Sequence, residues 1–128
     1  MNKNNGSNDW GVAFSHINWF QRLLETHGNI THIDRHDDLV FEVDRVRQSD
    51  HLTILSCSEY TMSSTLVQKA LSEFGNLNII HIGGGWNSYT SEAKDFCLKR
   101  QVGLYNSGEM TGGLWKNEFW SYEKPNTD

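Results

Sequence analysis

From position 50 onwards, extended and helical segments alternate along this sequence, and that alternation constrains the fold more than any other feature. Residues 51–58, "HLTILSCS", and 77–82, "LNIIHI", are short apolar runs of the kind found in strands. Residues 63–75 between them, "SSTLVQKALSEFG", predict a helix with a serine at its start and a glycine after its end. This succession predicts a parallel strand pair covered by the helix.

The same pattern continues towards the end of the chain. Residues 90–101, "TSEAKDFCLKRQ", predict a helix that begins at Thr90 or Ser91. Residues 102–106, "VGLYN", predict one more short strand. The apolar strand before this helix contains His81, which we expect to be a buried histidine with its hydrogen bonds satisfied.

The N-terminal part predicts a helix followed by an extended segment. Apolar residues recur at three- and four-residue spacing over 10–27, and Gly28 ends this helix. Residues 30–43, "ITHIDRHDDLVFEV", predict one extended segment with an acidic kink. A polar connection without a helix leads to the strand at 51–58, so we expect these two strands to be antiparallel.

The predicted fold class is therefore α/β, with a mixed β-sheet flanked by helices in the order αββαβαβ and an aromatic tail. A chain of 128 residues commonly forms one domain. We expect a single domain over 1–128, with a flexible segment at 1–9, a core at 10–106 and a tail at 107–128 that packs on the core or on a partner.

Composition and charge narrow the classes of partner. The net charge of −5 argues against an extended nucleic-acid surface and suits a protein partner or an inhibitory protein. No apolar run approaches the roughly 20 residues that cross a bilayer, and the first ten residues lack a signal-peptide core. We therefore expect a cytoplasmic protein with no membrane partner. Cys57 and Cys97 lie in apolar surroundings, which predicts buried free thiols.

A run of three glycines, Gly83, Gly84 and Gly85, follows the apolar strand at 77–82, with Trp86 directly after it. A strand, a glycine loop and a helix start can present backbone N–H groups to a phosphate. The run lacks both the GxGxxG spacing and the Lys-Ser/Thr ending of nucleotide loops. The sequence therefore favours a tight structural turn over an anion-binding or nucleotide-binding loop.

A second polar pattern is "THIDRHDD", in which His32, Asp34, His36 and Asp38 alternate. On a strand these four side chains would share one face, and imidazoles with carboxylates suit Zn²⁺, Mn²⁺ or Fe²⁺. The alternative is a solvated strand end rich in polar residues, which we favour. Asp34, His36 and Asp38 are the candidate metal ligands.

The segments taken together resemble the Mrr-like restriction endonuclease domain, a branch of the PD-(D/E)xK nuclease fold. The resemblance is carried by the order and spacing of five stretches: "FQRLLETHG", "DDLVFEV", "LTILSCS", "NIIHIGGGWNSYTSEAKDF" and "VGLYNSGEM". It spans about 95 residues, from the first helix to Asn106. It implies a restriction-endonuclease-like fold, in which the strand, glycine loop and helix at 78–96 are mainly scaffold.

The resemblance also implies where catalytic residues would stand. Family nucleases hold Mg²⁺ with an Asp and with a Glu or Gln of the next strand, and a Lys stabilises the developing charge. Asp38 matches the Asp, but Ser56 stands at the Glu or Gln position and Ser58 at the Lys position. A serine is a poor ligand for a hard cation and brings no positive charge.

An active site rebuilt from other residues is an alternative hypothesis. Glu42 lies four residues after Asp38 and would share its face on an extended strand. Glu59 follows Ser58, and Lys69 of the next helix would replace the missing lysine. Such a site would use Mg²⁺ or Mn²⁺ to cut DNA.

The tail gathers aromatic residues in "GGLWKNEFWSYE". On a helix, Trp115, Phe119 and Tyr122 would share a face, with Trp120 beside them. They predict a lid over the domain's own core or, alternatively, a surface for a partner or a homodimer.

Our main hypothesis for function is a catalytically degenerate restriction-endonuclease-like protein that acts by binding DNA or a protein partner, in phage defence or mobile-element biology. Three alternatives stay open: an active metal-dependent DNA nuclease with a rearranged site, a small acidic immunity or inhibitor protein, and a nucleotide-binding protein that uses the glycine loop.

Overall fold

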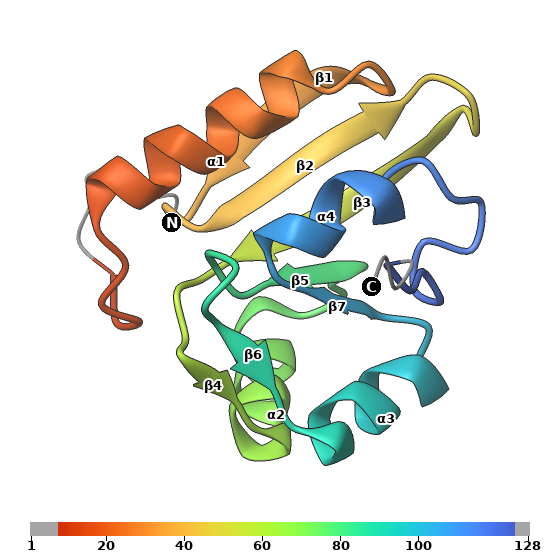
Figure 1. The fold of residues 1–128 in the computed structure, drawn as a ribbon. Coiled ribbons are helices and arrows are strands. Elements are labelled where there is room, and N and C mark those ends of the chain that lie inside the picture. Colours follow the sequence, from red (N-terminus) through yellow and green to blue (C-terminus); the bar gives the residue numbers. More distant parts are fainter. Residues whose placement is uncertain (1–7, 125–128) are drawn as a thin grey trace.

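The computed structural model describes residues 8–124 and forms an α/β fold around a central sheet (Figure 1). The flexible segment expected at 1–9 lies outside the described residues, apart from Asn8 and Asp9. In chain order the elements are α1 (Phe14–Thr26), β1 (Ile30–His36), β2 (Val40–Arg45), β3 (Asp50–Ser56), β4 (Thr61–Met62), α2 (Ser64–Phe74), β5 (Ile79–His81), β6 (Ser88–Tyr89), α3 (Ser91–Lys99), β7 (Gly103–Tyr105) and α4 (Ser107–Gly113).

The main sheet is mixed, as the sequence predicts. Its five strands lie in the order β1-β2-β3-β5-β7. β1, β2 and β3 are antiparallel to their neighbours, whereas β3, β5 and β7 run parallel. The parallel strands are those joined by α2 and α3, which confirms the expected strand–helix–strand units. A second sheet consists of the two short strands β4 and β6.

The prediction of one extended segment at 30–43 is wrong. The segment is a hairpin, in which β1 and β2 are separated by a turn at Asp37 and Asp38. Both residues have left-handed backbone conformations, with φ angles of 51° and 61°. Two consecutive left-handed residues reverse the chain, and the short polar side chain of aspartate tolerates this conformation better than most.

Helices cover both faces of the sheet, with α1 and α4 over one face and α2 and α3 packed together over the other (Figure 1). On the first face Phe20 of α1 packs edge-on against Phe41 of β2 at a ring separation of 5.3 Å. On the second face the buried side chains of α2 and α3 include Val67, Ala70 and Ala93. Both cysteines are buried free thiols, as expected.

The tail forms a short helix, α4, but Trp115, Phe119 and Tyr122 lie beyond it and do not share a helical face. Helix α4 ends at Gly113, and residues 114–124 form turns and irregular structure. The capping box of Asn106 and Glu109 fixes the start of α4. The last two residues of the helix, Gly112 and Gly113, have low helix propensity and do not favour its continuation into the aromatic residues. Phe119 is nevertheless buried, and Tyr122 lies edge-on to Tyr105.

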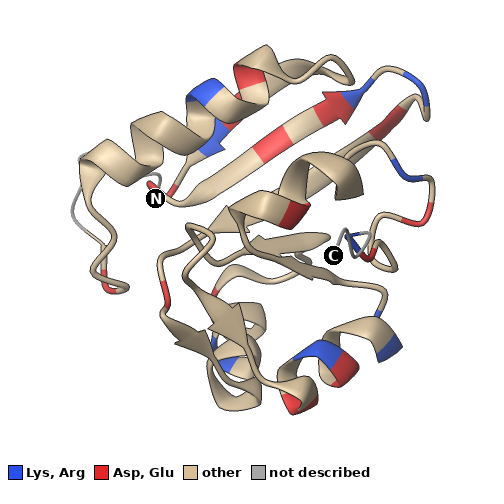
Figure 2. Cartoon of the chain, in the orientation of Figure 1, with Lys and Arg blue, Asp and Glu red and all other residues tan. Residues whose placement is uncertain are grey.

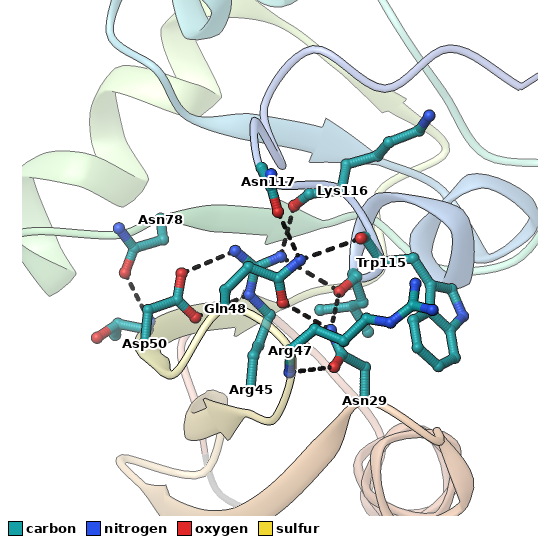
Figure 3. A network of polar contacts seen from close by, with 11 residues as sticks. Asn29, Arg45, Arg47, Gln48, Asp50, Asn78, Trp115, Lys116 and Asn117 are labelled. Atoms are coloured by element: carbon teal, nitrogen blue, oxygen red, sulfur yellow. Dashed lines mark hydrogen bonds and ion pairs between the residues drawn. The ribbon is translucent and has the colours of Figure 1, made fainter.

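A polar network holds the tail against the turn between β2 and β3 (Figure 3). The Arg45 guanidinium, whose side chain is fully buried, pairs with both carboxylate oxygens of Asp50 at 2.8 and 2.7 Å. It also donates to the carbonyls of Leu114 and Lys116. Asn29 donates to the Leu114 carbonyl at 2.9 Å and so ties the start of β1 to the same point.

Replacing Asp50 by Asn leaves the buried Arg45 charge without its carboxylate. We expect the free energy of unfolding to fall by about 2 kcal/mol, which is less than for a fully buried pair because Asp50 is partly exposed. Urea denaturation measures this. Asp44→Asn is the matched control, because Asp44 pairs at an exposed position and should cost well under about 1 kcal/mol. Equal losses in the two variants would contradict the role given to Arg45.

Candidate functional site

The carboxyl ends of the three parallel strands lie side by side and define the candidate site. Ser56 ends β3, His81 ends β5 and Tyr105 ends β7, and these three residues are register partners across the sheet. In open α/β sheets, ligands bind preferentially at this edge. The loops that leave the three strands at this edge are therefore the candidate binding elements.

A hydrogen-bonded chain, here called the buried polar chain, runs through this edge. His16 Nε2 of α1 lies 3.1 Å from Ser56 Oγ, which lies 2.9 Å from His81 Nδ1. His81 Nε2 lies 2.9 Å from Ser107 Oγ at the start of α4. Ser107 Oγ donates in turn to the carbonyl of Gly83 at 2.7 Å. The chain thus joins α1, two strands, α4 and the glycine loop.

Only one proton arrangement satisfies the buried polar chain when His81 is neutral. The Gly83 carbonyl can only accept, so the Ser107 hydroxyl donates to it and must accept from His81 Nε2–H. His81 Nδ1 is then an acceptor for the Ser56 hydroxyl, and Ser56 Oγ accepts from His16 Nε2–H. His16, Ser56, His81 and Ser107 thus each donate one hydrogen bond to the next group in the direction of the Gly83 carbonyl, and the chain is satisfied along its length.

Burial keeps His81 neutral. Its side chain is enclosed between Ser56 and Ser107 and stacks on Phe20 at a ring separation of 4.3 Å. Desolvation, and secondarily the neighbouring His16, lowers the pKa of His81 to about 3. Burial also lowers the pKa of His16, which is half-buried. Because Ser56 is fully buried, its hydroxyl serves to link the two imidazoles and is closed to a substrate.

Asp38, the position matched to the metal-binding aspartate, lies in the β1–β2 turn and outside β2. Its side chain is 1% exposed. The Arg35 guanidinium lies 3.4 Å from Asp38 Oδ1 and also donates to the Asp38 carbonyl. A cation is therefore already beside this carboxylate. Ser56, at the second matched position, is engaged by two imidazoles, so these residues do not fit a Mg²⁺ or Mn²⁺ ion.

The other residues of the rearranged-site hypothesis have separate partners. Because Asp38 is outside the strand, the expectation that Glu42 shares its face is wrong. Glu42 accepts hydrogen bonds from His36 and His51, and Lys69 lies over the Trp10 ring at 4.8 Å. The Glu59 amide donates to the Ile82 carbonyl, next to the glycine loop.

The histidine-rich hairpin forms a polar ladder on the uncovered part of the sheet. His36 and His51 bind the two oxygens of Glu42 at 2.9 and 2.8 Å, and His51 also binds Asp44 at 2.8 Å. Asp34 pairs in register with Glu42, but Asp38 leaves the strand, so the four-residue alternation is broken. Within residues 8–124, no group of three His, Cys, Asp or Glu is arranged to hold a metal ion.

The glycine loop divides into a fixed base and an open tip. Gly83 has a φ angle of 109°, and a Cβ at this position would lie 2.5 Å from Asn87 Nδ2. Gly84 and Gly85 have open space around them, and the Trp86 side chain is 91% exposed. The strand β6 separates the loop from α3, whose first turn is capped by Thr90. Gly83 is thus required by the backbone, and the loop does not open onto a helix N-terminus.

The tail aromatics have different environments. Trp115 is 41% exposed and lies between His27 and the Arg47 guanidinium. Phe119 is buried and Trp120 lies edge-on to it at 5.0 Å. Most of this tail therefore covers the domain's own core.

Sequence reasoning identified His81 as a buried, satisfied histidine, which is confirmed. It did not identify His16 and Ser107 as its partners in the chain. The one available signal was a polar residue at the end of each of two apolar strands, Ser56 and His81, which must be paired once buried. His16 and Ser107 come from helices distant in sequence and carry no local signal.

Comparisons with known proteins add no relative. The chain matches no protein-family model, and no curated protein or solved structure matches it. In the described part of the chain, no helix is long and apolar enough to cross a membrane.

His51 of the exposed ladder and His81 of the buried polar chain should change the free energy of unfolding in opposite directions as the pH falls. In the exposed ladder, the hydrogen bond to Asp44 and, to a smaller extent, that to Glu42 raise the pKa of His51. The protonated His51 therefore stabilises the fold below about pH 6.5, and this stabilisation is lost as the pH rises through the raised pKa. His81 stays neutral in the folded state, so the free energy of unfolding falls as the pH drops below about 6.5.

Proton NMR titration of the imidazoles measures both effects. We expect the His51 signal to titrate with a midpoint above the ordinary histidine value, and the His81 signal to stay constant from about pH 8 to about pH 5. A His81 signal that titrates near about pH 6.5 would contradict a closed, neutral buried polar chain.

Proposed function

We propose that the protein is a catalytically degenerate member of the restriction-endonuclease-like fold that acts by binding a partner. The order of helices and strands supports the proposal. A first helix, an antiparallel strand pair, and two strand–helix–strand units follow one another as the Mrr-like resemblance implies. The additional features are the β1–β2 hairpin and the small β4–β6 sheet.

The hydrogen bonds of the Ser56 hydroxyl are the main observation against catalysis. In an active relative, a metal ligand from this strand would face the aspartate matched by Asp38. Here the Ser56 hydroxyl is used by His16 and His81, and the Asp38 carboxylate lies beside Arg35. Two imidazoles thus occupy the Ser56 hydroxyl, and a guanidinium lies beside the Asp38 carboxylate, where a metal site would need both groups to contact the ion.

The distribution of charge favours a protein partner over DNA. In the view of Figure 2, Lys and Arg are interspersed with Asp and Glu over α1, the antiparallel strands, α3 and the tail. The net charge of −5 also opposes a polyanion. A small acidic protein that binds a protein partner suits a role in phage defence, counter-defence or mobile-element biology, including that of an immunity or inhibitor protein.

The test is cleavage of supercoiled and linear DNA with Mg²⁺ or Mn²⁺. We expect no cleavage by the wild type, by Asp38→Ala or by Asp95→Ala, which removes an exposed carboxylate from α3 as the matched control. Calorimetric titration with either ion should show no binding that depends on Asp38. Cleavage that is lost in Asp38→Ala and kept in Asp95→Ala would overturn the degenerate assignment.

A further inference from the structure

Two adjacent loops at the carboxyl edge of the sheet expose large aromatic side chains. Tyr60, in the loop before β4, is 76% exposed, and Trp86, at the tip of the glycine loop, is 91% exposed. Trp and Tyr are enriched among the residues that contribute most to binding at protein interfaces. We call Glu59, Tyr60 and Trp86 the aromatic tip.

The loops that carry the aromatic tip are fixed to each other. The Ser88 amide donates to the Tyr60 carbonyl at 2.9 Å, and the Glu59 amide donates to the Ile82 carbonyl at 3.0 Å. Asn87 closes the glycine loop through its side-chain amide, which donates to the same Ile82 carbonyl at 2.7 Å. The backbone of the tip is therefore ordered before a partner arrives, which lowers the entropic cost of binding.

The buried polar chain ends at the base of this loop. The Gly83 carbonyl accepts from both the hydroxyl and the amide of Ser107, each at 2.7 Å. The network that occupies the degenerate catalytic position thus supports the segment that presents Trp86. A rigid backbone with an exposed indole at its end is the arrangement expected of a binding anchor.

The charge of the aromatic tip identifies the kind of partner. Residues 57–62 and 82–90 contain one carboxylate, Glu59, and no Lys or Arg. Figure 2 shows the ribbon of β4, β6 and their loops without a blue segment and with red on the loop that leads into β4. Aromatic faces attract cations, and a carboxylate adds to that attraction, whereas a nucleic acid would find no cation here.

We propose that the aromatic tip binds an arginine-bearing segment of a protein partner. The proposal rests on the proposed function and names its binding surface. Arginine suits the site because its planar guanidinium stacks on an indole or phenol ring and pairs with a carboxylate. Trp86 provides the main stacking face, Tyr60 a second face, and Glu59 the compensating charge.

The experiment measures fluorescence anisotropy of a labelled peptide of alternating arginine and glycine. An alternating glutamate–glycine peptide and a single-stranded oligonucleotide are measured beside it. We expect the wild type to prefer the arginine peptide, and Trp86→Ala to weaken that binding about tenfold, as truncation of an aromatic anchor does. Glu59→Gln should weaken it by a smaller factor.

Matched variants separate the aromatic tip from other surfaces. Trp115→Ala removes a partly exposed indole from the tail, and Glu25→Gln removes an exposed carboxylate from α1. Both should change peptide affinity by less than about twofold, as expected for residues outside the interface. Because Trp86 is almost fully exposed, Trp86→Ala should unfold at the same temperature as the wild type.

The outcomes are distinct. Loss of binding in Trp86→Ala, with Trp115→Ala unchanged, supports the proposal. Absence of arginine-peptide binding by the wild type, or equal losses in the two tryptophan variants, overturns it. Binding of the oligonucleotide through Trp86 also overturns it and assigns the tip to nucleic acid. None of these results depends on DNA cleavage, so the proposed loss of catalysis can fail separately.

Discussion

The hydrogen bonds of the Ser56 hydroxyl to two imidazoles are the interaction on which the rest of this structure depends. Ser56 ends β3, and it is joined to His16 of α1 and to His81 of β5. Burying an imidazole costs free energy unless its nitrogens are paired, so this hydroxyl satisfies the buried His81 and joins it to the half-buried His16 of α1. A glutamate or glutamine at this buried position would bring a larger polar group, whose carboxylate or amide would need further hydrogen-bond partners.

The same interaction connects the interior to the surface. From His81 the hydrogen bonds continue to Ser107 and end on the Gly83 carbonyl, at the base of the loop that presents Trp86. Under the proposed function, the carboxyl edge of the sheet is a structural support in place of a metal site, and the exposed loop beside it is the proposed binding element. Neutral imidazoles suit that purpose because they donate and accept without requiring a counter-ion.

The general architecture could be predicted from the sequence because it follows from local patterns. The alternation of strands and helices after position 50 predicted the parallel pairs. Gly75 marked the end of α2, and Thr90 marked the start of α3. The β1–β2 hairpin was missed because Asp37 and Asp38 lack the glycine that commonly marks such a turn. The helical face considered for Trp115, Phe119 and Tyr122 does not form, because the helix of the tail, α4, ends at Gly113 before these residues.

The candidate site was harder to predict because its contacts join residues that are far apart in sequence. Asp38 was expected to lie on a strand and to share a face with Glu42, but its left-handed backbone places it in the β1–β2 turn, beside Arg35. The two ends of the hydrogen-bonded chain around His81, His16 of α1 and Ser107 of α4, come from helices distant in sequence, and no pattern within either helix indicates them. The exposure of Trp86 likewise depends on how two loops meet, which local sequence does not specify.

The central claim is that the buried polar chain supports the loop that carries Trp86. Nitrogen-15 relaxation of the backbone amides from Gly84 to Asn87 tests it most directly, in the wild type and in Ser107→Ala, with Ser91→Ala as the control. The account predicts order parameters of about 0.85 in the wild type and the control, and lower values in Ser107→Ala, which keeps the amide bond to Gly83 but loses the hydroxyl bond. Unchanged order in Ser107→Ala would contradict it, because the loop would then be held without the chain.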